Sequence, residues 1–372
     1  MEFNKHSEYH IFDSLIDNNI HFALFRLPYA DNINLILQKS EDSYSFNQLD
    51  QLNSKKGFVI APYNISGSCP ILLISPDVVL NSKDAIFDYI SSLNLQSRPK
   101  VAGLSPIVQH DSNSFNRYQK VYEAFQEELE SGTSSKLVLS RTFDIERGEH
   151  FSPGASFHKA CVKYPNNFVY LCHTPVSGTW LGCSPEKLIS GKDGKWQTDA
   201  LAGTQKVKSA DEPVIWDNKN KLEQQIVADY MQQQLQKAGI QATNKEAETI
   251  QAGDLLHLRS EFSFELDKPE NLGDILQLLH PSPAVNGFPK DEAFRFILDN
   301  EGYPRSYYSG FLGLLDPGDQ TDLYVNLRCM QVTGNTLRLY AGGGILPSSD
   351  LFSEWKETEN KLQTILSIIE NL

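Results

Sequence analysis

The chain has 372 residues, of which 40% are hydrophobic and 22% are charged, so it is long enough to bury a large core. Its formal net charge of -14 and its pI near 5.1 argue against nucleic acid as a partner, because polyanions bind basic surfaces. The first residues lack the pattern of a signal peptide, and no apolar run reaches the roughly 18 residues that a membrane span needs. The five cysteines are scattered without a pairing pattern, so we expect a cytoplasmic protein that does not bind membranes.

The first 110 residues alternate short apolar runs with Asn, Ser, Pro and Gly, a pattern typical of strands joined by small turns. The runs cover residues 21–27, 34–37, 57–61 and 71–74. From residue 112 to 130 the apolar side chains recur at helical spacing instead, and Gly132 is suited to end that helix.

Strands and helices then mix along the rest of the chain. We expect strands at 136–141, 168–173, 178–183, 255–265 and 323–332, a long helix at 218–237 with Leu222 in its buried stripe, and a helix at the C-terminus. No linker-like segment interrupts residues 1–372, which favours one large domain. Strands dominate over long helices, so the predicted class is α/β (α+β), with antiparallel sheets flanked by helices. Neither a GxGxxG nor a P-loop motif is present.

One stretch near the C-terminus combines several groups that suit an acidic ligand. The glycine triplet at residues 342–344 offers backbone N–H groups without a Cβ in the way. In the helix that follows, Glu354, Glu357 and Lys361 share one face. Two carboxylates, an ammonium and free amides suit a divalent cation with a small acid. The alternative is a glycine turn before an amphipathic helix with a surface ion pair, worth about 0.3–0.5 kcal/mol.

Two further residues are candidates for proton transfer. Lys136 opens a predicted strand, where a lysine usually extends its amine to water. As a general base it would need its pKa lowered, which burial or a neighbouring cation would achieve. Glu186 lies at a turn in the sequence GCSPE, where it is either solvated or, in a desolvated site, a general acid.

Three more residues have both a structural and a functional interpretation. Glu223, beside the buried stripe of the helix at 218–237, is either a surface carboxylate or a magnesium ligand. His280 lies between a leucine and a proline, where a structural hydrogen bond is as open as a catalytic role. Arg328 lies inside an apolar strand, so its guanidinium needs an anionic partner, either a core carboxylate or a ligand.

Together, the order and wording of these motifs resemble the chorismate-utilising enzyme family, which includes isochorismate, salicylate and anthranilate synthases. The resemblance covers residues 112–372, whereas residues 1–110 match only loosely. It implies one chorismate-binding domain over residues 1–372, two stacked antiparallel sheets with helices outside, and a magnesium-dependent site between them. The motifs are KLVLSR (136–141), GCSPE (182–186), LAGT (201–204), LHPSPA (279–284), GFP (287–289), LRC (327–329), AGGGI (341–345) and EWKET (354–358), with Lys361.

The resemblance assigns the chemistry by position. Lys136 resembles the base that activates water for attack at C2 of chorismate, and Glu186 resembles the acid that protonates the departing C4 hydroxyl. Glu223 and Glu357 resemble the ligands of Mg²⁺, with Glu354 close by and acting either directly or through water. The cation would hold the ring carboxylate of the substrate.

Six other positions resemble the family's substrate-binding residues. Arg328 and the amides near Gly344 resemble the clamp for the enolpyruvyl carboxylate. The remaining four are Gly203 and Thr204, in the loop at the ring-carboxylate end, Lys361, a further anion contact, and His280, near the ring.

The nucleophile distinguishes the members of the family. By this resemblance, the members that use ammonia lack a lysine at the position of Lys136. The aminodeoxychorismate synthases carry a lysine in place of Ala202. Lys136 with Ala202 therefore indicates water. We expect conversion of chorismate to isochorismate, for menaquinone or siderophore biosynthesis, with no protein partner required. A salicylate synthase that releases pyruvate and a catalytically inactive chorismate-binding relative stay open as alternatives.

Overall fold

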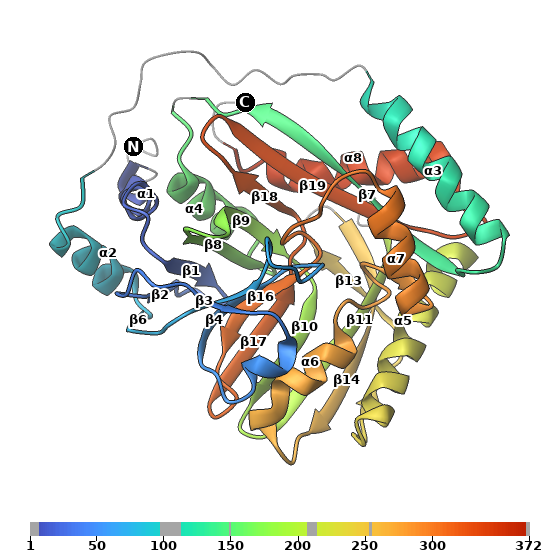
Figure 1. The fold of residues 1–372 in the computed structure, drawn as a ribbon, viewed down its shortest axis with the longest axis horizontal. Helices are drawn as coiled ribbons and strands as arrows, with labels where there is room; N and C mark the ends of the chain where they lie inside the picture. Colours follow the sequence, from blue (N-terminus) through green and yellow to red (C-terminus); the bar gives the residue numbers. More distant parts are fainter. Residues whose placement is uncertain (1–6, 97–112, 149, 207–213, 253–254, 370–372) are drawn as a thin grey trace.

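The computed structural model describes residues 7–96, 113–148, 150–206, 214–252 and 255–369. Within them, the strands β1–β19 belong to two antiparallel sheets that face each other (Figure 1). The first sheet has the strand order β15 (Gly287–Phe288), β7 (Lys136–Glu146), β19 (Thr336–Ile345), β18 (Cys329–Val332), β9 (Gly178–Ser184), β8 (Phe168–Thr174), β1 (Phe22–Arg26), β2 (Asn34–Leu37) and β6 (Val78–Leu80).

The second sheet is built from strands of both halves of the chain. Its order is β12 (Thr243–Asn244), β14 (Leu255–Glu265), β11 (Lys195–Lys206), β10 (Lys187–Lys192), β17 (Gln320–Val325), β16 (Phe311–Leu315), β4 (Gly57–Ala61), β5 (Ile71–Ile74) and β3 (Tyr44–Phe46), with β13 (Glu248–Ala252) also paired to β14. The N-terminal region thus completes the ends of both sheets rather than forming a sheet of its own.

Helices cover the outer faces of the two sheets. The first sheet is covered by α1 (Ile11–Asp17), α2 (Lys83–Ser92), α4 (Pro153–Lys163) and α8 (Leu351–Leu366). The second sheet is covered by α5 (Asn218–Lys237) and α6 (Leu272–Leu279). Two further helices, α3 (Ser114–Glu130) and α7 (Lys290–Asn300), pack beside β7. Short 3₁₀ helices span Ser7–His10, Leu49–Leu52 and Pro269–Asn271.

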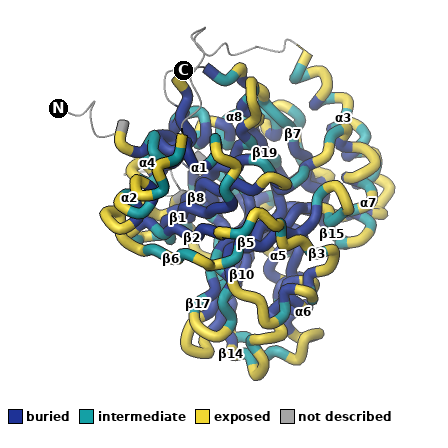
Figure 2. The backbone as a smooth tube through the Cα atoms, turned by 60° about the vertical axis from the view of Figure 1, so that its left-hand side comes forward, coloured by how far each residue is buried: buried dark blue, intermediate teal, exposed yellow. Residues whose placement is uncertain are grey.

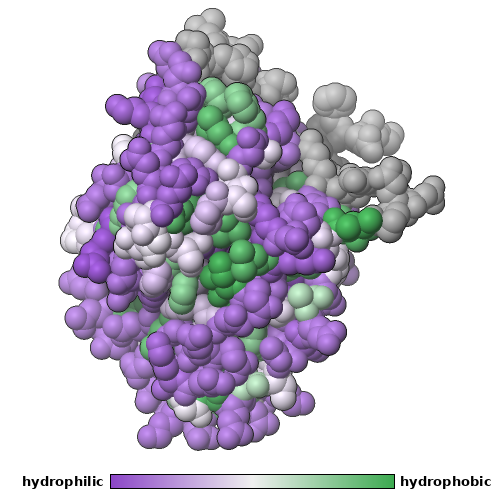
Figure 3. Space-filling view, turned by 90° about the vertical axis from the view of Figure 1, so that its right-hand side faces the viewer, coloured by the Kyte–Doolittle hydropathy of each residue, from purple (hydrophilic) through white to green (hydrophobic). Residues whose placement is uncertain are grey.

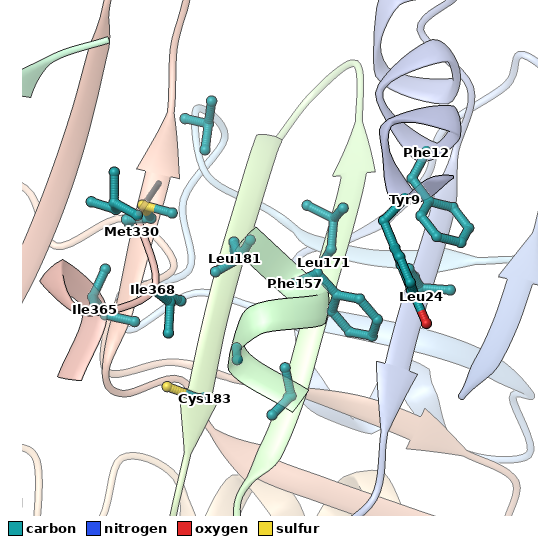
Figure 4. Packing of buried hydrophobic residues seen from close by; sticks show 14 of the residues in the cluster. Tyr9, Phe12, Leu24, Phe157, Leu171, Leu181, Cys183, Met330, Ile365 and Ile368 are labelled. Atoms are coloured by element: carbon teal, nitrogen blue, oxygen red, sulfur yellow. The ribbon is translucent and has the colours of Figure 1, made fainter. Parts of the chain in front are cut away.

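The two-residue period of the strands divides the apolar side chains between layers. In β1, Phe25 faces the space between the sheets, whereas Leu24 faces the outer cluster. Figure 4 shows that outer cluster, where Leu24 and Leu171 of the strands meet Phe12 and Phe157 of the helices. The strands are accordingly the most buried part of the molecule, and exposed residues concentrate in the helices and connecting loops (Figure 2).

Several predicted elements are confirmed, and so is the architecture of two antiparallel sheets with helices outside. The helix at 218–237 and the strand at 255–265 have the predicted bounds. The helix predicted from residue 112 runs over Ser114–Glu130, and Ser112 itself lies outside the described residues. The division into a single domain stays a prediction.

Other expectations are wrong. The strand expected at 323–332 is two strands, because Arg328 has a positive φ of 46° and the chain there crosses from the second sheet to the first. The first 110 residues contain helices α1 and α2 besides the strands. Leu222, placed in the buried stripe of α5, is 54% exposed, whereas Val227 and Met231 pack inward. The glycine triplet extends strand β19 and is not a turn.

The surface agrees with the acidic, polar composition. Figure 3 shows one face of the molecule covered mostly by hydrophilic side chains, with apolar groups confined to small patches. Within the described ranges, none of the helices has both the length and the apolar character of a membrane span. All five cysteines are free thiols.

Candidate active site

A pocket with about 620 Å³ of empty space, part of it open to solvent, lies where elements of both sheets meet. Strand β19 contributes the glycine triplet from the first sheet, and β11 contributes residues 201–204 from the second. Helices α5 and α8 add Glu223 and Lys361, and the turn between β9 and β10 adds Glu186. Residues distant in sequence therefore converge on one space.

Glu186 is held in the pocket wall by its backbone. Its carbonyl oxygen accepts a hydrogen bond of 2.9 Å from Val325 N, which ties the turn to the second sheet. The residue is 5% exposed, and this burial raises the pKa of its carboxyl to about 8, although the charge of Lys136 acts in the opposite direction. Glu186 is therefore largely protonated near neutral pH, as a general acid must be.

Lys136 is wholly buried, so the alternative in which its amine extends to water is excluded. Its Nζ lies 3.1 Å from Glu223 Oε1, but it makes no hydrogen bond of good geometry. Burial lowers the pKa of Lys136, against the opposing effect of Glu223. The pocket surface is formed by Glu223, while Lys136 lies behind it. Lys136 therefore contacts a residue that lines the pocket but does not line the pocket itself.

Three carboxylates near the pocket each have a lysine partner. The pairs are Glu223 with Lys136 at 3.1 Å, Glu354 with Lys219 at 2.6 Å, and Glu357 with Lys361 at 2.6 Å. Among the described residues, no three or more His, Cys, Asp or Glu side chains lie close enough together to hold a metal ion by themselves. Mg²⁺ commonly uses only one or two protein carboxylates and completes its shell with water and substrate oxygens.

Two observations indicate that a cation fits beside these carboxylates. Glu354 is 1% exposed, and its Oε2 is buried without a hydrogen-bond partner. Gly343 has no Cβ, and a Cβ there would lie 3.4 Å from Glu354 Oε2 and 3.3 Å from Glu357 Oε1. Burial and the neighbouring Glu357 raise the pKa of Glu354 to about 7. Burial acts the same way on Glu357, but Lys361 and Lys219 outweigh it and lower that pKa.

Gly344 is needed for space beside the Lys136–Glu223 pair. A Cβ at this position would lie 2.1 Å from Glu223 Oε1 and 3.0 Å from Lys136 Cε. No side chain larger than hydrogen fits without moving the pair. The glycine triplet therefore lets the strand pass close to the charged groups while it stays paired with β7.

Arg328 is oriented by a histidine that the sequence analysis did not select. Arg328 Nη2 lies 3.3 Å from Nε2 of His257, and Nη1 donates a hydrogen bond of 3.4 Å to Thr364 Oγ1. Because a guanidinium only donates, His257 Nε2 must accept, and its Nδ1 donates to Gly203 O at 2.9 Å. Burial, and then the charge of Arg328, lowers the pKa of His257 to about 3, so the ring is neutral.

Thr204 is tied to helix α5 through another residue that the sequence analysis passed over. Its backbone N donates a hydrogen bond of 3.0 Å to Asn220 Oδ1. Gly203 has a φ of +74°, which is favourable only for glycine. The loop that bears Gly203 and Thr204 is thus fixed relative to the carboxylate of Glu223, one helical turn from Asn220.

His280 is not among the residues that line the pocket, and its place near the ring stays a prediction. Its Nε2 donates a hydrogen bond of 3.1 Å to Pro62 O, and its ring packs edge-on against Phe311. Burial lowers the pKa of His280 to about 3, so it is a neutral ring in the core. This is the structural role that the sequence left open.

The other predicted site residues fall into two neighbouring groups. Those that line the pocket are Glu186, Gly203, Thr204, Glu223, Arg328, Gly344 and Lys361. Glu354 and Glu357 line a groove that shares Thr204 with the pocket. Their individual roles stay predictions.

Comparison with known proteins shows which family the chain belongs to. The profile of the family described as chorismate binding enzymes matches residues 74–370. The chain is 30% identical to isochorismate synthase MenF of Escherichia coli (strain K12) over 264 residues, which are 68% of this chain and 60% of that protein. It is 29% identical to isochorismate synthase EntC of the same strain over 243 residues, 63% of this chain and 62% of EntC.

The match thus spans about three fifths of the length of these relatives. In the solved structures, the menaquinone-specific isochorismate synthase MenF from Escherichia coli superposes with a TM-score of 0.76 at 23% identity. That superposition covers 96% of this chain and 90% of the MenF chain. The fold predicted from the sequence is therefore confirmed.

Proposed function

Since the chain belongs to the chorismate binding enzyme family, we propose that it is an isochorismate synthase, which isomerises chorismate to isochorismate. The single observation that carries this proposal is the pocket in which a buried, protonated Glu186 faces the cations Arg328 and Lys361. Such a pocket suits a small dianion from which a hydroxyl group must leave.

The reaction needs one proton removed and one proton supplied. We propose that Lys136 takes a proton from water as that water forms a bond to C2. Glu186 gives its proton to the C4 hydroxyl, the C4–O bond breaks, and the ring double bond shifts. One water enters and one leaves, so the change is an isomerisation. Opposite shifts of the two pKa values, down for Lys136 and up for Glu186, suit a base and an acid.

Binding of the dianion falls to the cationic side of the site. Arg328, whose guanidinium is fixed by His257, would hold one substrate carboxylate with Lys361 nearby. Mg²⁺, held by Glu223 and Glu357 with Glu354 close by, would supply the positive charge for the ring carboxylate. In an acidic protein this local charge is required, because the remaining surface repels an anion.

Two small residues bear on the choice among the family's reactions. Ala202 lines the pocket. By the family resemblance, aminodeoxychorismate synthases carry a lysine at this position, so the alanine favours water over an amine as the nucleophile. Ala284 lines it as well and belongs to the run that resembles isochorismate synthases rather than salicylate synthases. We further propose that the enzyme is cytoplasmic and supplies menaquinone or siderophore biosynthesis.

Product analysis by NMR tests the proposal. The protein is incubated with chorismate and Mg²⁺ without ammonia, and we expect a mixture of chorismate and isochorismate without pyruvate. Salicylate with an equal amount of pyruvate would assign the chain to the salicylate synthases. An aminated product formed only with added ammonia would overturn the assignment of water. No change in either condition would indicate the inactive binding relative.

A further inference from the structure

Lys219 makes a contact in the site that the proposed reaction does not use. It lies in the first turn of α5, and its Nζ is 2.6 Å from Glu354 Oε1. Ser349 Oγ donates a hydrogen bond of 2.7 Å to the same oxygen. Oε1 is therefore fully engaged, while Oε2 of the same carboxylate is buried without a partner. The two contacts fix which oxygen of Glu354 is free.

The free oxygen points to the place where a cation fits. It lies 3.4 Å from the position that a Cβ of Gly343 would take, and Glu357 Oε1 lies 3.3 Å from that position. Two carboxylate oxygens from successive turns of α8 therefore face one point beside the glycine. Rotation of the Glu354 carboxylate away from Lys219 and Ser349 would lose this arrangement.

The stability of α5 does not explain a lysine at this position. The N-terminus of a helix carries partial positive charge, so a lysine in its first turn is unfavourable. The helix is already capped by Asp217, whose side chain accepts a hydrogen bond of 2.8 Å from Asn220 N. The first turn contains no acidic residue, and although Glu223 one turn further along the helix also attracts the Lys219 ammonium, the ion pair is made with Glu354. Its partner is on α8, across the groove.

We propose that Lys219 is a positioning residue for the divalent cation. By holding Oε1 of Glu354, together with Ser349, it presents Oε2 to the cation. This inference rests on the proposed function, which requires Mg²⁺. Residues that orient a metal ligand commonly change metal affinity by about 10- to 100-fold when they are removed. A lysine that merely competes with the cation would have the opposite effect, because its removal would tighten binding.

Mn²⁺ alone, as a spectroscopic substitute for Mg²⁺, tests the proposal without turnover. Its dissociation constant is measured by EPR for the full chain and for Lys219→Met, Lys219→Arg and Ser349→Ala. We expect Lys219→Met to weaken Mn²⁺ binding about tenfold or more. Ser349→Ala should weaken it less, and Lys219→Arg should restore much of the affinity because it keeps the charged donor.

Lys356→Met is the matched control. Lys356 is on α8, its side chain is 66% exposed, and its ion pair is with Glu359. Its removal changes the net charge equally but leaves Glu354 untouched, so Mn²⁺ affinity should stay the same.

Each contrary result has its own meaning. Unchanged or tighter Mn²⁺ binding in Lys219→Met would overturn the positioning role while leaving the proposed function intact. If that variant does not fold, unchanged affinity in Ser349→Ala would overturn the inference instead. A wild-type protein that binds no Mn²⁺ would reject both the inference and the proposed cation, whereas the NMR product analysis tests the reaction separately.

Discussion

Two buried ion pairs beside β7 are built in opposite ways. The pair of Glu301 and Arg305 is 2% exposed on each side, with both guanidinium–carboxylate contacts at 2.6 Å. Arg305 also donates hydrogen bonds of 2.7 Å to the carbonyl oxygens of Val138 and Val285. Glu301 Oε1 accepts two more, from the N and Oγ of Ser140. Every part of this pair is satisfied.

The pair of Lys136 and Glu223 is incomplete by comparison. Its atoms are 3.1 Å apart, and the ammonium has no hydrogen bond of good geometry although it is wholly buried. An unsatisfied buried donor costs about 1–3 kcal/mol. The unsatisfied ammonium of Lys136 therefore lowers the stability of the fold. The Arg305 pair, which contacts β7 at Ser140, four residues after Lys136, has no such unsatisfied group. A satisfied pair fixes the structure, whereas an unsatisfied amine is free to react.

Lys136→Met is the strongest test of this contrast. We expect turnover of chorismate to fall by about 10²–10⁴-fold, the usual contribution of a general base. The free energy of unfolding should change by less than about 2 kcal/mol, because the lost ammonium had no good hydrogen bond. Steady-state kinetics and urea denaturation check the two expectations. Wild-type turnover would remove Lys136 as the base, and a large loss of stability would make it a structural residue.

Arg305→Met should reverse the pattern. Removal of one partner of a satisfied buried pair leaves Glu301 as an uncompensated charge and costs about 3–5 kcal/mol. The measurement is the urea midpoint, compared with that of Arg338→Met. Arg338 is the matched control, since its pair with Asp144 is about half exposed and worth at most about 1 kcal/mol. Equal losses in the two variants would contradict the structural role of Arg305.

Glu186 sharpens the comparison, because it is a buried group kept neutral. Burial above all raises its pKa from 4.5 to about 8. Between these values the unfolded chain has lost the proton and the folded chain has kept it, so stability falls as pH rises, by at most about 1.4 kcal/mol per unit. We expect Glu186→Gln to lose turnover but to gain stability over wild type progressively from pH 4.5 to 8. A pH-independent difference in urea midpoint would show that folding does not raise the pKa of Glu186.

The contrast also explains how far the sequence could be interpreted. Apolar periodicity was sufficient for β14 and α5, because each buries one regular face. It was not sufficient at Arg328, since a single positive φ inside an apolar run leaves no local signal. The family resemblance placed Glu186 and Glu223 in one site, and both line the pocket. The spacing of residues in the sequence did not predict the contact between Lys136 and Glu223.

Partners from distant segments were the part that the sequence could not supply. Lys219 and His257 act through residues 135 and 71 positions away, respectively, so neither pairing has a local pattern. His257 did carry one usable sign, a polar residue within the regular alternation of β14. His280 carried a stronger sign, its proline-rich motif, and yet it is a core residue.

The two histidines give the last and smallest expected effect. His280→Gln removes a neutral ring bonded to Pro62 O outside the pocket, so we expect a loss of about 1–2 kcal/mol in the free energy of unfolding and nearly unchanged turnover. His257→Gln should instead raise KM for chorismate, because Arg328 loses the acceptor that orients it. Kinetics and urea denaturation of both variants separate the cases. A large fall in kcat for His280→Gln alone would restore the catalytic role that its motif suggested.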